Sequence, residues 1–216
     1  MDSSASVQVD PERVKIVLPA DFEMPPGGLN IRWPDPPLEQ EMRLHKYKLY
    51  AALAFARANK LDRTVIDSPK PRFGIVTTGK SYLDVMQALE DLGIDEAHAS
   101  EIGLRVYKVG MVWPLEREGI RHFAEGLEEI LVVEEKRAVI ENQMKEQLYN
   151  WREDVRPRVI GKFDEQRNWI LPSADELTPA RIARVIAARI ARFYTSERIK
   201  QRLAFLEAKE AALAKP

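Results

Sequence analysis

Apolar segments in the middle of this 216-residue chain alternate between two lengths and two periodicities, and this alternation constrains its fold most strongly. Short runs rich in β-branched residues, as in residues 72–78, are each followed by a longer segment whose apolar residues recur with helical spacing. Strands separated by helices of this length form parallel sheets, because a parallel pair needs a long crossover connection. We therefore expect an α/β domain over residues 68–164.

Four strands and three helices are expected within this domain. The strands are predicted at residues 72–78, 104–113, 130–133 and, as an edge strand, 159–163. The helices between them are predicted at residues 81–92, 116–127 and 136–151. The run Ile130-Leu131-Val132-Val133 is apolar throughout, which is typical of a strand covered on both faces. The predicted fold is a three-layer α/β/α arrangement around a mostly parallel sheet.

The segments on either side differ from this domain. Residues 1–67 begin with a proline-rich stretch, in which each ring fixes φ and restricts the preceding residue, and then give a helical pattern over residues 38–60. Residues 165–216 contain two helix starts, at Thr178-Pro179 and at Thr195-Ser196-Glu197. We expect an extended lead-in with a helix, the α/β domain, and C-terminal helices. If the chain is part of a larger protein, both flanks should dock on surfaces outside it.

Composition excludes several classes of function. The 33 basic and 34 acidic residues give a net charge of −1, so no overall field favours nucleic acid or an anionic membrane. The absence of cysteine excludes disulfides, iron–sulfur ligation and thiolate zinc sites in this chain. His45, His98 and His122 are scattered singly, so no metal site is expected. No apolar run approaches the roughly 20 residues that span a bilayer, and a cytoplasmic protein fits best.

Ligands of open parallel sheets bind beyond the carboxyl ends of the strands, and three loops leave such ends here. In the first, Gly79, Lys80 and Ser81 join a strand to a helix. Free amides at the helix start, a hydroxyl and an ammonium together suit a phosphate or carboxylate, although the first glycine of a P-loop is missing. Two interpretations stay open: an anion contact, or a tight turn in which Thr78 or Ser81 caps the helix.

The other two loops favour structural roles. Trp113 ends a strand before Pro114, and an aromatic residue there usually closes a core or an interface. Glu134 and Glu135 offer acid/base chemistry if one of them is buried with a raised pKa. At a helix start, however, such carboxylates more often complement the helix dipole or pair with neighbours. No catalytic residue is predicted.

A basic stripe lies near the C-terminus and consists of Arg181, Arg184, Arg189 and Arg192. It offers contacts to RNA, to a phosphate-bearing cofactor or to an acidic partner. The balanced net charge and the lack of an aromatic platform favour instead a solvated helix face that pairs with another subunit or domain.

Several segments resemble one family of enzymes. Residues 73–85, residues 103–115 and the run Ile130-Leu131-Val132-Val133-Glu134-Glu135 resemble the indolepyruvate ferredoxin oxidoreductases of the 2-oxoacid:ferredoxin oxidoreductase superfamily. Residues 24–33 and 51–66 resemble the long, fused bacterial members. Those members are much larger, so the resemblance implies an internal piece, similar to the transketolase C-terminal domain, that lacks the diphosphate-binding Gly-Asp-Gly…Asn pattern.

The resemblance also implies a function for the parent enzyme. It would oxidatively decarboxylate indolepyruvate and related aryl 2-oxoacids, form the acyl-CoA and reduce ferredoxin, with thiamine diphosphate, Mg and [4Fe-4S] clusters bound outside these residues. The piece alone would bind no cofactor, would be inactive, and would contact other domains of the same polypeptide and a second subunit. No family motif assigns a role to Gly79, Lys80 and Ser81, but a phosphate of coenzyme A could reach them. The alternative is a free-standing α/β module that binds a nucleotide or another anion.

Overall fold

The computed structural model describes residues 9–213, and the chain divides into two compact units, Met1–Lys60 and Leu61–Pro216. The second unit contains the predicted α/β domain and also the C-terminal helices. This division differs from the expected boundaries at residues 67/68 and 164/165, because the C-terminal helices share the core of the sheet.

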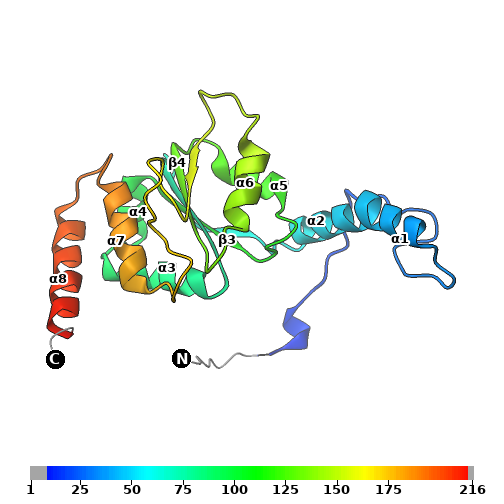
Figure 1. Ribbon diagram of the computed structural model, residues 1–216, viewed down its shortest axis with the longest axis horizontal. Helices are drawn as coiled ribbons and strands as arrows, with labels where there is room; N and C mark the ends of the chain where they lie inside the picture. The colour runs from blue at the N-terminus through cyan, green and yellow to red at the C-terminus, as the bar shows by residue number, and fades with distance from the viewer. Residues whose placement is uncertain (1–8, 214–216) are drawn as a thin grey trace. The chain divides into compact units, whose positions relative to one another are not determined.

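The second unit is built on a five-stranded sheet with the order β1-β3-β2-β4-β5 (Figure 1). Strands β2 to β5 run parallel to one another, and β1 pairs with β3 in the antiparallel sense. The strands are β1 Arg63–Ile66, β2 Phe73–Thr78, β3 Leu104–Val109, β4 Glu129–Val133 and β5 Arg158–Ile160. The mostly parallel sheet is confirmed, and β1 was not predicted.

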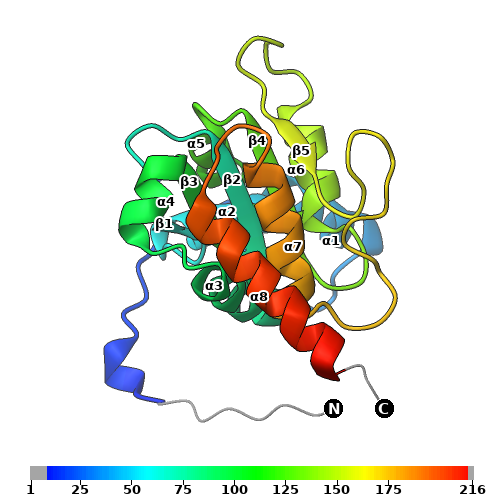
Figure 2. The same cartoon turned by 90° about the vertical axis from the view of Figure 1, so that its left-hand side faces the viewer.

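Helices cover both faces of the sheet, so the three-layer α/β/α arrangement is confirmed. On one face lie α3 Gly79–Asp91, α4 Glu96–Ile102 and α7 Pro179–Ile190, with α8 Glu197–Leu213 crossing outside α7 (Figure 2). On the other face lie α5 Arg117–Ala124 and α6 Ile140–Leu148. Helix α4, like β1, was not predicted.

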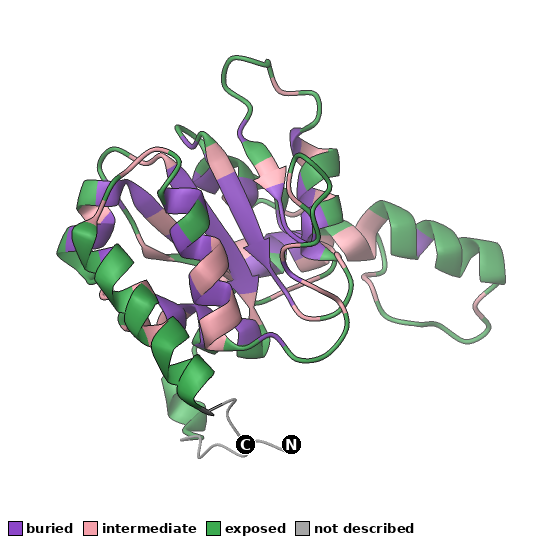
Figure 3. Ribbon diagram, turned by 60° about the vertical axis from the view of Figure 1, so that its left-hand side comes forward, coloured by how far each residue is buried: buried purple, intermediate pink, exposed green. Residues whose placement is uncertain are grey.

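The sheet separates two apolar cores, because successive residues of a strand point to opposite faces. In β2, Ile75 belongs to the core under α3, α4 and α7, and Val76 belongs to the core under α5 and α6. Figure 3 shows the central strands as buried. Gly74 is needed for this packing, because a Cβ there would lie 2.6 Å from a methyl group of Leu127.

Several predicted elements are shorter than expected, among them β5 and α5, and for β3 and α6 the structure gives the physical reason. Strand β3 ends at Val109 because the Asp62 carboxylate, rather than a neighbouring strand, accepts the Gly110 and Met111 amides at 2.7 and 3.1 Å. Helix α6 begins at Ile140 rather than near residue 136, because Lys136 has φ 52° and interrupts the helical backbone.

The C-terminal helices pack on the sheet of this chain. Thr178 caps α7, accepting the Arg181 amide at 3.3 Å, and Pro179 occupies the first helical position, as predicted. Ile182, Ile186 and Ile190 are buried in the first core. The expectation that residues 178–216 dock on surfaces outside the chain is therefore corrected for α7, whose apolar face is already covered.

The first unit holds an irregular lead-in and one helical segment. Its helical segment consists of α1 Pro37–Arg43, a π-helical turn η2 Leu44–Lys48 and α2 Leu49–Ala58. Before it, residues 9–36 contain only one short 3₁₀ turn, η1 Pro11–Arg13. In the described residues, an irregular segment therefore precedes the helical one.

Polar contacts inside the first unit hold the lead-in against its helices. Asp35 accepts two hydrogen bonds from the Arg43 guanidinium at 2.7 and 3.0 Å. The Asn59 side chain donates to the Val17 carbonyl at 2.9 Å and accepts from the Val17 amide at 2.8 Å. Large apolar side chains nevertheless stay exposed, and Trp33 is 97% exposed.

Candidate functional site

The carboxyl edge of the parallel sheet brings together side chains from three parts of the sequence. Lys80 follows β2, Glu134 and Glu135 follow β4, and Glu176 lies in the segment that leads into α7. Ion pairs and hydrogen bonds connect these segments directly. The edge at which ligands of such sheets bind is therefore occupied by charged groups of the chain itself.

Lys80 lies at the centre of a carboxylate cluster. Its ammonium nitrogen is 2.7 Å from Asp84 Oδ2, 2.9 Å from Glu176 Oε1 and 3.9 Å from Glu135 Oε1. It also donates to the Leu177 carbonyl at 3.3 Å. The hydrogen bond to Asp84 raises the pKa of Lys80. Any added anion would compete with carboxylates for this lysine.

The other two predicted residues of this loop have different surroundings. Gly79 has φ 53°, and an added Cβ would meet no atom within 4 Å, so the backbone at the start of α3 is open on that side. Ser81 is buried, and its hydroxyl has no hydrogen-bond partner among the residues described. The anion contact at Gly79, Lys80 and Ser81 stays a prediction.

Neither residue proposed as the cap of α3 acts through its side chain. Thr78 occupies the N-cap position, but its hydroxyl donates to the Val109 carbonyl at 2.8 Å and so joins β2 to β3. Ser81 makes no such bond within residues 9–213. The capping interpretation is therefore corrected: the first amides of α3 have no side-chain acceptor in the described part of the chain.

The two glutamates after β4 have structural roles. The buried Glu134 carboxylate accepts the amides of Val139, Ile140 and Glu141 at 2.9 to 3.1 Å, so it caps α6. Glu135 accepts the Leu177 amide at 3.3 Å. The interpretation that these carboxylates serve the helix start and neighbouring groups is confirmed, and neither is left as a free acid or base.

Lys162 is a buried lysine that was not singled out from the sequence. Its ammonium donates to the Glu134 carbonyl, and its own amide donates to Glu141 Oε2 at 3.0 Å. Burial lowers the pKa of the Lys162 ammonium. The first bond joins the segment after β5 to the end of β4, and the second joins it to α6. Its only sequence signal is a lysine inside the edge strand predicted at residues 159–163, whereas the observed strand ends at Ile160.

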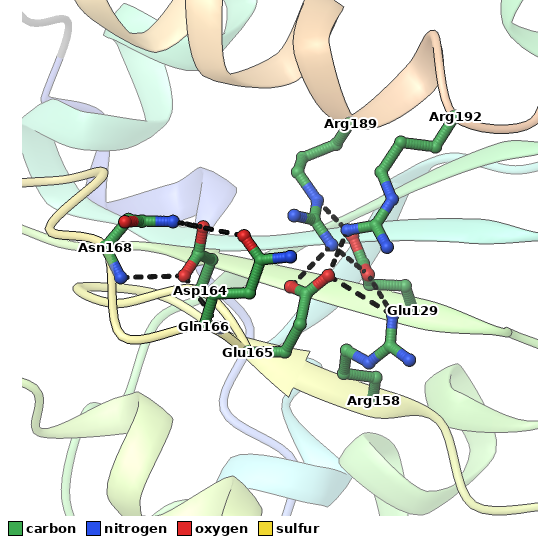
Figure 4. A network of polar contacts seen from close by, with 8 residues as sticks. All are labelled: Glu129, Arg158, Asp164, Glu165, Gln166, Asn168, Arg189 and Arg192. Carbon is green, nitrogen blue, oxygen red and sulfur yellow. Dashed lines mark hydrogen bonds and ion pairs between the residues drawn. The ribbon is translucent and has the colours of Figure 1, made fainter.

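The amino edge of the sheet carries a second charged network (Figure 4). Arg189 of α7 donates to both oxygens of Glu129 at 2.7 and 2.5 Å and to Glu165 at 3.0 Å. Arg158 is 3.3 Å from Glu129, and Arg192 pairs with Glu165. The Glu165 carboxylate accepts a hydrogen bond from the backbone amide of Glu165 itself and further hydrogen bonds from Arg192 and Arg189. Together they lower the pKa of Glu165 to about 2.

This network corrects the interpretation of the arginine stripe. Arg189 and Arg192 pair with carboxylates of this chain, and Arg184 pairs with Glu210 of α8. The predicted pairing with another subunit or domain is therefore replaced, for these three residues, by contacts that hold α7 to the sheet and to α8.

The remaining candidates do not form a site. Trp113 is 64% exposed, so it does not close the core, and an interface role stays a prediction. His98 is buried, with Nε2 3.2 Å from the Ser196 hydroxyl and Nδ1 3.4 Å from the Gly93 carbonyl. Within residues 9–213, no group of three histidine, aspartate or glutamate side chains is arranged to hold a metal ion. None of the helices described there has the length and apolar character needed for a membrane crossing.

Comparison with known proteins identifies the family. Residues 62–216 match the indolepyruvate ferredoxin oxidoreductase middle domain, and the chain belongs to this family. The resemblance noted from the sequence is thus confirmed. The match begins at residue 62, the second residue of the second unit, and includes α7 and α8.

Curated relatives are much longer than this chain. It is 30% identical over 123 residues to the indolepyruvate oxidoreductase subunit IorA of Pyrococcus abyssi, which is 56% of this chain and 17% of that protein. The match to IorA of Thermococcus kodakarensis is 30% identical over 116 residues and covers 54% of this chain and 16% of the relative. The matched segments therefore span less than a fifth of these relatives.

Two solved structures show weaker likeness. One is a 2-oxoglutarate:ferredoxin oxidoreductase from Magnetococcus marinus with 2-oxoglutarate, coenzyme A and succinyl-CoA bound, at 15% identity and a TM-score of 0.48, covering 72% of this chain and 24% of that one. The other is a split-gene transketolase in an inactive β4 tetramer, at 14% identity and a TM-score of 0.36, covering 66% of this chain and 41% of that one. The assignment of the α/β fold is based on the strand order and the helix layers of this chain, described above.

Proposed function

We propose that this chain acts as an internal assembly domain of an indolepyruvate:ferredoxin oxidoreductase in the cytoplasm. The observation that carries the proposal is the family match over residues 62–216, together with relatives that are several times longer. The parent enzyme would oxidatively decarboxylate aryl 2-oxoacids, form acyl-CoA and reduce ferredoxin. Thiamine diphosphate with Mg and the [4Fe-4S] clusters would be bound by domains or subunits outside these residues.

The chain alone should be catalytically inactive. The carboxylates at the carboxyl edge of the sheet, Glu134, Glu135, Asp84 and Glu176, all have partners inside the chain. A general base needs a free acceptor within reach of substrate, and paired carboxylates of this kind do not supply one. This arrangement supports a role in holding the domain together and presenting its surface to neighbouring domains.

The size of the native polypeptide tests this proposal. An antibody raised against the chain should detect, in an immunoblot of source cells, a band several times larger than the 216-residue chain. The enriched large species should reduce ferredoxin with indolepyruvate and coenzyme A, and the isolated chain should not. A native band of the size of this chain would instead favour the free-standing module.

The two hypotheses also differ in how the flanks behave. A domain of a larger enzyme should expose the lead-in, which then docks elsewhere, whereas a free-standing module should protect both flanks. The packing of α7 in the core is compatible with both hypotheses. The exposed apolar side chains of the lead-in support a domain of a larger enzyme. Limited proteolysis should therefore remove the lead-in before it cuts α7, and protection of both flanks would favour the module.

We also propose that a phosphate of coenzyme A contacts the start of α3 at Gly79, Lys80 and Ser81 in the parent enzyme. The uncapped amides of α3 and the open space beside Gly79 support this contact, and Lys80 would exchange a carboxylate for the phosphate. Titration of coenzyme A into the chain and into its Lys80→Ala variant should give weaker binding for the variant. Equal affinity for both would overturn this contact and leave the family assignment intact.

A further inference from the structure

A short exposed segment precedes α7 at the carboxyl edge of the sheet. Residues 172–176, which we term the strap, contain no helix or strand and join two fully buried leucines, Leu171 and Leu177. None of the residues between these leucines is buried. A segment with few buried contacts opens locally at little cost, while the core contacts at its two ends stay in place. The strap therefore has the properties of a movable cover.

Two lysines hold the strap in its place. Lys80 follows β2, and its ammonium nitrogen is 2.9 Å from Glu176 Oε1. Lys136 follows β4 and donates to the Asp175 carbonyl at 2.9 Å. These are the only hydrogen bonds and ion pairs of the strap among the residues described. The hydrogen bond from Lys80, and also the positive charge of Lys136, lowers the pKa of Glu176, so its carboxylate faces both cations.

Hydrogen-bond donors without acceptors lie directly beside Lys80. The first amides of α3 have no side-chain acceptor among the residues described. The Thr77 and Ser81 side chains are buried, and their hydroxyls have no partner there either. Thr77 shares with Ile75 the face of β2 on which α3 packs, and the side chain of Ser81 tilts towards the start of α3. Buried polar groups normally have partners, so a bound anion would supply acceptors that the chain lacks.

Glu176 is the carboxylate that keeps such an anion out. Asp84, Glu176 and Glu135 lie 2.7, 2.9 and 3.9 Å from the Lys80 nitrogen, and a phosphate beside it would meet all three negative charges. Asp84 belongs to α3, and Glu135 is held by the Leu177 amide. Only Glu176 is carried by the exposed strap, so it is the charge that can leave.

We propose that Glu176 is the internal occupant of an anion site at the start of α3, and that a phosphate-bearing ligand displaces the strap and binds both Lys80 and Lys136. The strap is then an autoinhibitory contact, and Lys136 is a further binding residue. This inference rests on the proposed contact between a phosphate of coenzyme A and the start of α3. It adds a second cation to that site and a device that closes it.

Titration calorimetry of coenzyme A with variants of the full chain tests the role of the strap. Glu176→Gln should bind about fivefold more tightly than the wild-type chain, because an exposed ion pair no longer has to break. Asp175→Asn is the matched control. It removes the same charge from the neighbouring residue, whose side chain makes no contact among the residues described, and asparagine tolerates its φ of 61°. Its affinity should stay within about twofold of the wild-type value.

The role of Lys136 is tested in the same way. Lys136→Gln should bind coenzyme A about fivefold more weakly than the wild-type chain, because one of the two cations is lost. Arg137→Gln removes a charge from the next residue, which is exposed and whose side chain has no partner in the described part of the chain. It should bind as the wild-type chain does. Equal affinities of these two variants would overturn the assignment of Lys136.

The outcomes separate the strap from the contact on which it rests. If Lys80→Ala weakens binding but Glu176→Gln binds no more tightly than Asp175→Asn, the strap's role is overturned and the proposed contact stands. Binding that Lys80→Ala leaves unchanged, in the wild-type chain and in Glu176→Gln alike, would overturn both. So would the absence of binding to every variant.

Hydrogen exchange followed by mass spectrometry tests the displacement itself. Without ligand, the amides of residues 173–177 should exchange faster in Glu176→Gln than in the wild-type chain or in Asp175→Asn. Saturating coenzyme A should speed exchange of the same amides in the wild-type chain, because the strap is released. Exchange that is unchanged or slowed on binding would overturn the displacement, even if the affinities follow the expected order.

Discussion

The two units of this chain use their apolar residues differently. In Leu61–Pro216, the side chains of β2 and β4 are covered on both faces by helices, and Phe73 is fully buried. In the described residues of the first unit, 9–60, there is one helical segment and no strand, and Trp33 is 97% exposed. A stable domain needs at least two packed layers, so the exposed apolar residues of the first unit are available for contacts outside that unit.

The largest expected effect tests this contrast with two aromatic residues. Phe73→Ala should lower the free energy of unfolding by about 3–5 kcal/mol, because it leaves a cavity in a closed core. Trp33→Ala should change it by less than about 0.5 kcal/mol, because the indole contacts little of the folded chain. Urea unfolding followed by circular dichroism measures both. Similar losses for the two variants would contradict the contrast.

The next effect concerns the arginines that are buried in each unit. Arg189→Ala should destabilise the second unit by about 1.5–3 kcal/mol, because the Glu129 carboxylate loses the guanidinium that donates hydrogen bonds to both of its oxygens. Arg43→Ala removes a similar pair with Asp35 in the first unit. It should release the turn at Asp35 to protease while leaving the main unfolding transition in place. If Arg43→Ala shifts the main transition as far as Arg189→Ala does, the two units are not energetically separate.

Acid should weaken the network at the amino edge of the sheet. Because the pKa of Glu165 is lowered to about 2 from an unfolded value of 4.5, its contribution is complete above pH 4.5 and is lost as the pH falls towards 2. Urea midpoints of the wild-type chain and of Glu165→Gln should differ at pH 7, approach each other below pH 4.5 and converge only at about pH 2. A difference that stays constant over this range would show that the charge of Glu165 contributes nothing.

The smallest effect concerns the start of α7. Thr178→Ala should cost about 1 kcal/mol, because the amide of Arg181 loses its side-chain acceptor. Thr195→Ala provides a matched control, since Thr195 is exposed and its hydroxyl makes no hydrogen bond among the residues described. Equal midpoints for the two variants would exclude a stabilising cap at Thr178.

The sequence predicts the elements of the sheet well where the apolar pattern is long. Strand β4 is apolar after Glu129 and β2 is rich in apolar and β-branched residues, and the parallel arrangement follows from the helices between the strands. Strand β1 was missed because it has only four residues, of which Arg63 and Thr64 are exposed. Helix α4 was missed because it is short, although Asp95 caps its start and Gly103 ends it with φ 81°.

The charged clusters were predicted less well, because their members are distant in sequence. Lys80 was singled out for its place at a helix start, but Glu135 and Glu176 reach it from the end of β4 and from the segment before α7. The partners of the arginine stripe could not be predicted for the same reason. Glu129 and Glu165, which pair with Arg189, are distant from it in sequence and meet it only in the folded chain. Pairing of this kind follows from strand order, which periodicity alone does not determine.

Helix α7 is attached to β4 near both of its ends. Before the helix begins, the Leu177 amide donates to Glu135 just beyond β4, and at its last turn Arg189 holds Glu129 at the first residue of β4. A helix that is attached to a strand at two separated points cannot rotate independently of that strand. Displacement of α7 by a neighbouring domain would therefore move β4 as well. A force applied to the C-terminal helices would in this way be transmitted to the sheet.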